Sequence, residues 1–178
     1  MRTRTETTEK TERAERFDLS VFSAFSVISV LSALSCNPTT NRPELTPLPQ
    51  ALPVEVRYRR EAATERLARL LREDSIPLAQ VAVKDGYVES PWMEAATLQP
   101  TRKTPLGPDI VKLRGWVDPA RVGFSFVTVE VVYRPVLDRS LPERELDRIV
   151  QPDHPVQKRV EAVMEKVKVY ERGTRREE

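Results

Sequence analysis

The side chains with the strongest nucleophilic or metal-binding chemistry are one thiol, Cys36, and one imidazole, His154. A structural zinc site needs four cysteine and histidine ligands, so none is expected. A histidine-based triad needs a nucleophile and an acid around the imidazole, but His154 lies between an acid and Pro155 at an expected helix start, which suits a capping or surface residue. Either Asp153 or His154 would cap that helix. The five glycines stand singly and form no phosphate-binding loop. We therefore predict no catalytic residue, cofactor or bound metal.

Cys36 follows the most apolar stretch of the chain. Residues 19–35 contain no charge, proline or glycine, and a serine occupies every third position. A period of three drifts around a helix, so these serines form no polar face and an amphipathic surface helix is not expected. The seventeen residues, six of them serine, fall short of the ~20 mostly apolar residues of a comfortable membrane span. The stretch is typical of the apolar region of a secretory signal peptide.

Ala33, Leu34, Ser35 and Cys36 resemble the lipobox of bacterial lipoproteins. In that family the cysteine receives a diacylglycerol thioether, the leader is cleaved, and the new N-terminus is acylated. The resemblance implies lipidation of Cys36, cleavage after Ser35 and an exported protein anchored by lipid, at the outer membrane or the periplasmic face. Two alternatives stay open for residues 19–35: an uncleaved single-pass anchor and a buried core helix.

The 142 residues after Cys36 are enough for one domain with a core. The chain has 29 basic and 27 acidic residues, a net charge of +2, which gives no reason to expect nucleic acid as a partner. Five prolines in residues 37–53 favour extended polyproline II structure. We therefore expect a leader over 1–35, the lipidated cysteine and a tether over 36–53, a domain over 54–172 and a frayed tail over 173–178.

Hydrophobic periodicity predicts the elements of this domain. We expect a helix over 54–74, a β-hairpin over 78–93 with Asp85-Gly86 as a two-residue turn, strands over 110–118 and 123–134, a short helix to about residue 150, and a last helix from Pro155. This order predicts an α+β fold, a four-stranded antiparallel sheet with both main helices on one face, in the helix-grip-like order α-β-β-β-β-α.

The alternation in the two long strands divides their side chains between two faces. Val127, Val129 and Val131 are expected in the core, and the opposite face then carries Lys112, Arg114, Trp116, Thr128 and Glu130. Exposed aromatic residues beside a cation suit a protein partner or a hydrophobic ligand groove, and the alternative for them is ordinary core and sheet-edge packing. We predict a partner-binding face of Arg114, Trp116, Phe124 and Phe126.

Cys36, the hairpin 81–92, the strand pair 110–133 and the last helix together resemble outer-membrane lipoproteins of the BamC type, accessory parts of the β-barrel assembly machinery. Those proteins usually carry two such domains, and this chain has room for one. We expect a lipid-anchored, non-enzymatic envelope protein that binds a protein partner or aids envelope assembly. The alternatives are an exported enzyme with an unrecognised pocket and an uncleaved single-pass membrane protein.

Overall fold

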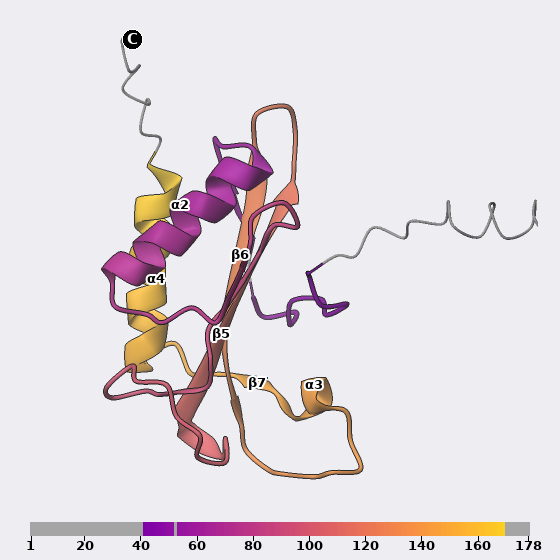
Figure 1. Ribbon diagram of the computed structural model, residues 1–178, viewed down its shortest axis with the longest axis vertical. Helices are drawn as coiled ribbons and strands as arrows, with labels where there is room; N and C mark the ends of the chain where they lie inside the picture. The colour runs from indigo at the N-terminus through magenta and orange to yellow at the C-terminus, as the bar shows by residue number, and fades with distance from the viewer. Residues whose placement is uncertain (1–40, 52, 170–178) are drawn as a thin grey trace, which may run out of the picture. The chain divides into compact units, whose positions relative to one another are not determined.

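The domain is built around a long hairpin of β5 (Gly107–Pro119) and β6 (Ser125–Arg134). A computed structural model describes residues 41–51 and 53–169 (Figure 1). In β5 and β6, β-branched residues alternate with polar ones, so the pleat sends Val117, Val127 and Val131 to one side, where all three are buried. The two strands pair in antiparallel register from Lys112↔Val132 to Pro119↔Ser125.

Short strands extend this hairpin into an antiparallel sheet with the order β1-β6-β5-β3-β2. β1 spans Val54–Val56, β2 Gln80–Ala82 and β3 Tyr87–Glu89. β4 (Met93–Glu94) pairs with β5, and β7 (Arg148–Ile149) pairs with β6. Within the described residues the sheet thus has seven strands and not the four expected. The three additional strands, β1, β4 and β7, have only two or three residues and no turn signal between them, so they show no periodic pattern.

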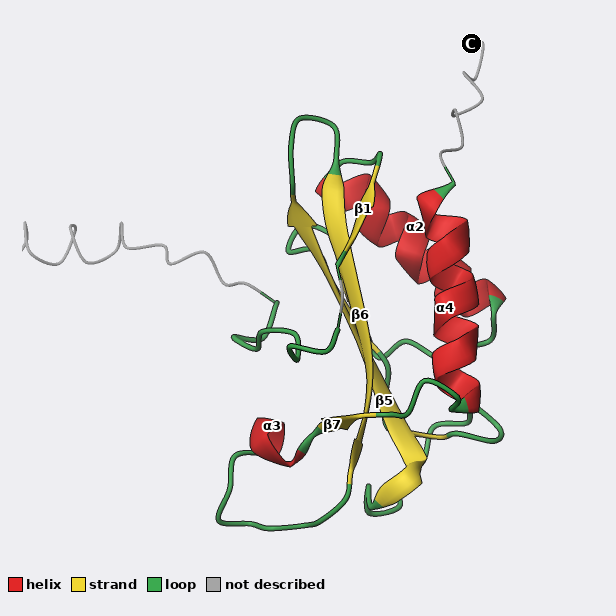
Figure 2. Cartoon of the chain, turned by 180° about the vertical axis from the view of Figure 1, so that it is seen from behind, coloured by secondary structure: helices red, strands yellow, loops and turns green. Residues whose placement is uncertain are grey.

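Two helices cover one face of the sheet, α2 (Arg60–Glu73) and α4 (Pro155–Lys168) (Figures 1 and 2). Leu67 and Leu71 of α2 and Val160 of α4 are buried in one core with the valines of β5 and β6. Burying each such side chain contributes about 1.5–3 kcal/mol. The α+β class and the position of both main helices are confirmed.

The predicted division of the strands between two faces is also confirmed. Arg114 lies opposite Glu130, and Trp116 lies opposite Thr128, on the face that the helices do not cover. We call it the open face of the sheet.

The predicted helix over 54–74 begins six residues late. Val54–Val56 form β1, and Val56 is 2% exposed and pairs with Ser125. Two β-branched residues separated by one polar residue suit a sheet edge, and the free edge of β6 provides the partner. The helix prediction was wrong here because it extended the pattern of α2 beyond Arg60.

The short helix expected to reach about residue 150 is shorter, and Ser140 and Glu143, which have the spacing of a capping box, do not form one. α3 has one turn, Glu143–Leu146, with no side-chain cap, and the Ser140 hydroxyl donates to Asp138 instead. The chain then enters β7, so the helix ends before residue 150. Of the two expected cap residues of α4, Asp153 and His154, it is His154 that caps the helix: its Nδ1 accepts from the Val156 N–H at 3.3 Å.

The turn between β2 and β3 differs from the two-residue turn expected. Four residues, 83–86, join the strands, and of these only Gly86 has a positive φ, +67°. The Gly86 carbonyl accepts from Val117 N–H at 2.8 Å, so the turn lies directly against β5. A Cβ at Gly86 would lie 2.2 Å from the Val117 oxygen. Glycine is required there by contact as well as by φ.

We expect Gly86→Ala to lower the free energy of unfolding by about 2–4 kcal/mol, the sum of a left-handed φ and a backbone clash. Gly123→Ala is the matched control, because Gly123 has φ +81° and nothing within 4 Å of an added Cβ. It should cost only about 1 kcal/mol. Urea unfolding measures both values, and equal losses would show that the contact with β5 does not constrain the turn.

Candidate functional site

The open face is covered by the chain's own N-terminal segment. Residues 41–51, the covering segment, cross β5 and β6 on the side opposite α2 and α4 (Figures 1 and 2). The Trp116 indole N–H donates to Leu45 O at 3.1 Å, and the Leu48 N–H donates to Glu130 Oε2 at 2.8 Å. Arg144 donates to Thr46 O. Side chains of the sheet and α3 thus bind the main chain of the segment.

The start of the covering segment is held at the β2 edge of the sheet and at the end of β5. The Asn41 N–H donates to Asp85 Oδ2 at 2.8 Å, and the Gln80 amide donates to Asn41 O. Both Arg42 Nη atoms donate to the Asp118 carboxylate, at 2.6 and 3.2 Å. A bidentate pair of this kind fixes orientation as well as distance.

These contacts change the interpretation of residues 36–53. The proline-rich composition predicted an extended tether, and residues 41–51 instead lie along the sheet. Prolines suit this role, because they lack an N–H and lose little freedom on ordering. Only residues 36–40 of the predicted tether precede the covering segment. These residues, which include Cys36, lie outside the described residues, and so does Ser35.

Beneath the segment lies a group of buried charges, which we call the ionic cluster. Arg114 Nη1 donates to Asp147 Oδ2 at 2.7 Å, and Arg134 Nε donates to Asp147 Oδ1 at 3.0 Å. Glu130 pairs with Arg114 at 3.5 Å and with Arg144. Burial opposes the charge of Arg114, but the hydrogen bond and charge of Asp147 outweigh it and hold the Arg114 pKa above its ordinary value. Each buried charge therefore has a partner of opposite sign.

A second ion pair lies on the same face, toward β3. Lys112 Nζ donates to Glu89 Oε1 at 2.6 Å, and the Tyr87 hydroxyl donates to Glu89 Oε2. Burial alone would raise the pKa of Glu89, but these two hydrogen bonds outweigh it and hold the pKa below its ordinary value. Burial, followed by the bond to Glu89, raises the pKa of Tyr87. The carboxylate of Glu89 thus stays charged and paired, which suits a structural role.

The four residues predicted as a partner-binding face do not form one exposed patch. Arg114 and Trp116 are buried, with 4% and 0% exposure, under the covering segment. Phe126 shares their face and is 42% exposed. Phe124 lies in the β5–β6 turn, where the Arg121 guanidinium stacks at 4.0 Å from its ring centroid. The strand alternation placed Arg114, Trp116 and Phe126 correctly, but it could not reveal what covers them.

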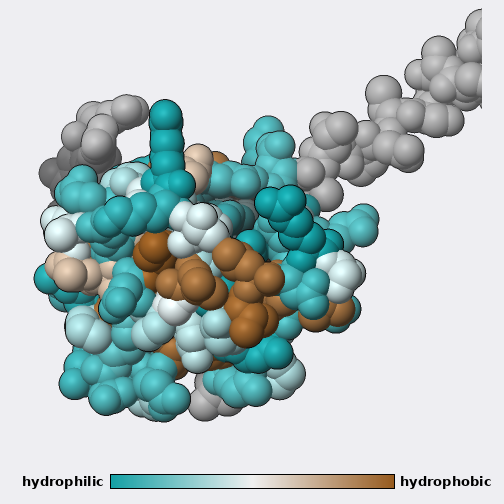
Figure 3. Space-filling model, turned by 90° about the horizontal axis from the view of Figure 1, so that it is seen from below, coloured by the Kyte–Doolittle hydropathy of each residue, from teal (hydrophilic) through white to brown (hydrophobic). Residues whose placement is uncertain are grey.

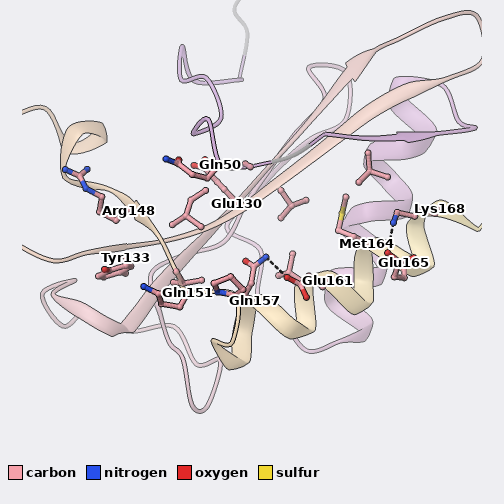
Figure 4. Close-up of a pocket in the computed structure, with 17 residues that line it drawn as sticks. Gln50, Glu130, Tyr133, Arg148, Gln151, Gln157, Glu161, Met164, Glu165 and Lys168 are labelled. Atoms are coloured by element: carbon pink, nitrogen blue, oxygen red, sulfur yellow. Dashed lines mark hydrogen bonds and ion pairs between the residues drawn. The ribbon is translucent and has the colours of Figure 1, made fainter.

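A groove opens at the β6 edge of the sheet, where α4, β7 and the end of the covering segment line it (Figure 4). β1 pairs with residues 125–127 of β6 and β7 with residues 132–133, so the groove lies beside the stretch between these short strands. Its volume is about 780 Å³, within the range of about 300–1,000 Å³ of ligand-binding clefts. The apolar lining residues include Val54, Val129, Val150, Val160 and Met164.

The polar lining of the groove is mostly neutral or paired. Gln50, Gln151 and Gln157 contribute amides, which both donate and accept hydrogen bonds. Gln157 donates to Glu161 at 3.1 Å, and Lys168 pairs with Glu165, both on α4 (Figure 4). An apolar lining with amides around it can bury apolar side chains while binding a peptide main chain.

Sequence reasoning did not find the groove. Val160 and Met164 were visible only as part of the apolar stripe of the last helix, and Val129 as a core residue. β1 and β7, which frame the groove, had no recognisable pattern.

Figure 3 shows the molecule from below the view of Figure 1. On this face, hydrophobic side chains, drawn in brown, gather within a hydrophilic surround.

Within residues 41–51 and 53–169, no helix is long and apolar enough to cross a membrane. The same residues contain no group of three or more histidine, cysteine, aspartate or glutamate side chains placed to hold a metal ion. Comparisons with protein families, curated proteins and solved structures found no match to the chain.

We expect Asp147→Asn to lower the free energy of unfolding by about 3–5 kcal/mol, because two buried arginines lose their shared counter-charge. Glu143→Gln is the matched control. Glu143 also pairs with Arg134, at 2.7 Å, but its side chain is 79% exposed, so its loss should cost under about 1 kcal/mol. Chemical denaturation at neutral pH measures both. Similar small losses would mean that the ionic cluster does not stabilise the fold.

Proposed function

We propose that this chain is a lipid-anchored, non-enzymatic protein of the bacterial envelope, and that its groove binds an extended segment of a protein partner. The groove supplies the observation that carries the binding part of the proposal. It combines a volume of about 780 Å³ with apolar residues from four elements, β1, β6, β7 and α4, and with neutral amides. The lipobox-like residues that end at Cys36 support the anchor.

The dimensions of the groove favour a short extended peptide. Its lining on α4 runs from Gln157 to Lys168, and eleven helical steps of 1.5 Å span roughly 16 Å. An extended chain rises about 3.3 Å per residue, so about five residues fit. Alternate side chains of such a segment would point to the apolar lining, and its amides would meet Gln50, Gln151 and Gln157.

The anchor needs no further membrane attachment. A single acyl chain binds a bilayer marginally, and two or more hold a protein stably. A triacylated Cys36 would therefore suffice. The covering segment begins at Asn41, five residues later, so a lipid on Cys36 would be joined almost directly to the folded domain.

Intact-mass measurement of the membrane-extracted protein tests the anchor. We expect a chain that lacks residues 1–35 and carries acyl chains, whereas Cys36→Ser should stay uncleaved, because the thioether is made on that sulfur. An unmodified full-length wild-type chain would contradict the lipid anchor and favour the single-pass alternative for residues 19–35.

Site-specific photo-crosslinking in the native cell tests the groove. We expect a photoreactive residue in place of Glu161, which is exposed and lines the groove, to yield a discrete protein adduct. The same residue in place of Lys158, exposed on α4 outside the groove, is the matched control and should yield none. Adducts from both positions, or from neither, would contradict peptide binding in the groove.

A further inference from the structure

The covering segment lies on the open face in the way that a bound peptide lies on its receptor. Trp116, Arg144 and Glu130 hold residues 45–48, and all three hydrogen bonds use the main chain of the segment. We propose that the open face is a peptide-binding site, and that an extended segment of a partner protein takes the place of residues 41–51 there. The proposal goes beyond peptide binding in the groove, because Trp116 and Arg144 are not among the residues that line the groove.

Contacts within the sheet and α3 fix the receptor side of this site. The Tyr87 ring packs edge-on against Trp116, with 5.7 Å between the ring centroids. Arg114 and Arg144 pair with the Glu130 carboxylate, which the ionic cluster thereby holds in place. A receptor whose side chains are already positioned loses little conformational freedom when it binds a peptide.

The covering segment itself is held more loosely than the groups beneath it. None of residues 41–51 is buried. The segment forms no strand, so its release would break none of the strand pairs of the sheet. An extended chain from another protein offers the same N–H and C=O groups, and main-chain hydrogen bonds supply much of the affinity for extended peptides. Replacement of one chain by the other therefore conserves these bonds.

Two side chains of the segment indicate which sequences fit the site. Leu45 packs against the small apolar cluster that contains Trp116, and the Arg42 guanidinium pairs with both oxygens of Asp118. The Leu48 N–H binds a buried carboxylate, so a proline, which has no N–H, does not fit at that position. We expect a partner segment to carry arginine, leucine three residues later, and a residue other than proline three residues after the leucine.

The covering segment competes with any added peptide. A ligand on a short tether has an effective concentration in the millimolar range, so the wild-type chain should bind a separate peptide weakly. Substitutions that weaken the segment and leave the open face unchanged should therefore raise the affinity for that peptide.

Fluorescence anisotropy of a labelled synthetic peptide tests the proposal. The peptide has the sequence of residues 41–51, NRPELTPLPQA, and it is added to the full-length chain in mild detergent. The released variant combines Leu45→Ser with Leu48→Pro, which removes the apolar contact and the N–H that binds Glu130. We expect the released variant to bind the peptide at least about tenfold more tightly than the wild-type chain does.

A modified peptide tests the main-chain contact itself. N-methylation at Leu48 removes the N–H that donates to Glu130, and the loss of a hydrogen bond to a charged group should weaken binding about tenfold or more. N-methylation at Glu44, an exposed residue whose N–H takes no part in these contacts, is the matched control and should have little effect. Equal effects of the two modifications would contradict binding on the open face.

Cross-linking then locates the peptide. A photoreactive leucine at the position of Leu45 should form an adduct with β3 or β5, where Tyr87 and Trp116 lie. An adduct on α4 would assign the peptide to the groove and overturn the proposal, and equal affinity of wild-type chain and released variant would do the same. So would a lack of binding by a released variant that circular dichroism shows to be folded.

A milder variant keeps the test decisive if the released variant does not fold. Arg42→Ala removes only an ion pair whose side chains are 26% and 47% exposed, so the domain should stay folded. It should bind the peptide several-fold more tightly than the wild-type chain, and an unchanged affinity would overturn the proposal.

Discussion

A buried guanidinium in the middle of a β-sheet is the constraint on which the open face depends. Arg114 lies on β5, which has β6 on one side and β3 on the other, and it is only 4% exposed. A charge taken out of water is tolerated when opposite charges and hydrogen bonds replace the water. Asp147 and Glu130 do this for Arg114, and each also binds another arginine. The segment 143–149 and the covering segment must therefore fold over this face.

The same cluster joins the N-terminal segment to the sheet. Glu130 binds the Leu48 N–H, and Arg144, which pairs with Glu130, binds the Thr46 carbonyl. Since the main chain supplies these groups, the attachment depends on an extended conformation more than on particular side chains, and the prolines of the segment favour it. Whatever lies before Asn41 is consequently joined to a segment that the sheet holds by hydrogen bonds and an ion pair.

The two faces of the sheet thus have different roles. One packs against α2 and α4 to form the apolar core, and the other is closed by ion pairs and the covering segment. With both faces occupied, the groove at the β6 edge is where apolar surface and hydrogen-bonding amides meet. It exists because β1 and β7 are short and pair with separate parts of β6.

Local patterns in the sequence determined the two long strands, the two main helices and the sides to which Arg114, Trp116 and Val127 point, because side-chain periodicity is a property of each element alone. The position before Pro155 likewise indicated a helix cap at Asp153 or His154, and the structure selects His154. The tertiary structure decided that Val54–Val56 pairs with β6, that residues 148–149 form β7, and that a proline-rich segment lies on Trp116. Each of these depends on a partner distant in sequence, between 71 and 82 residues away for the contacts of Leu45 and Leu48. No local pattern records such a partner, and for the same reason the groove became visible only once the sheet was assembled.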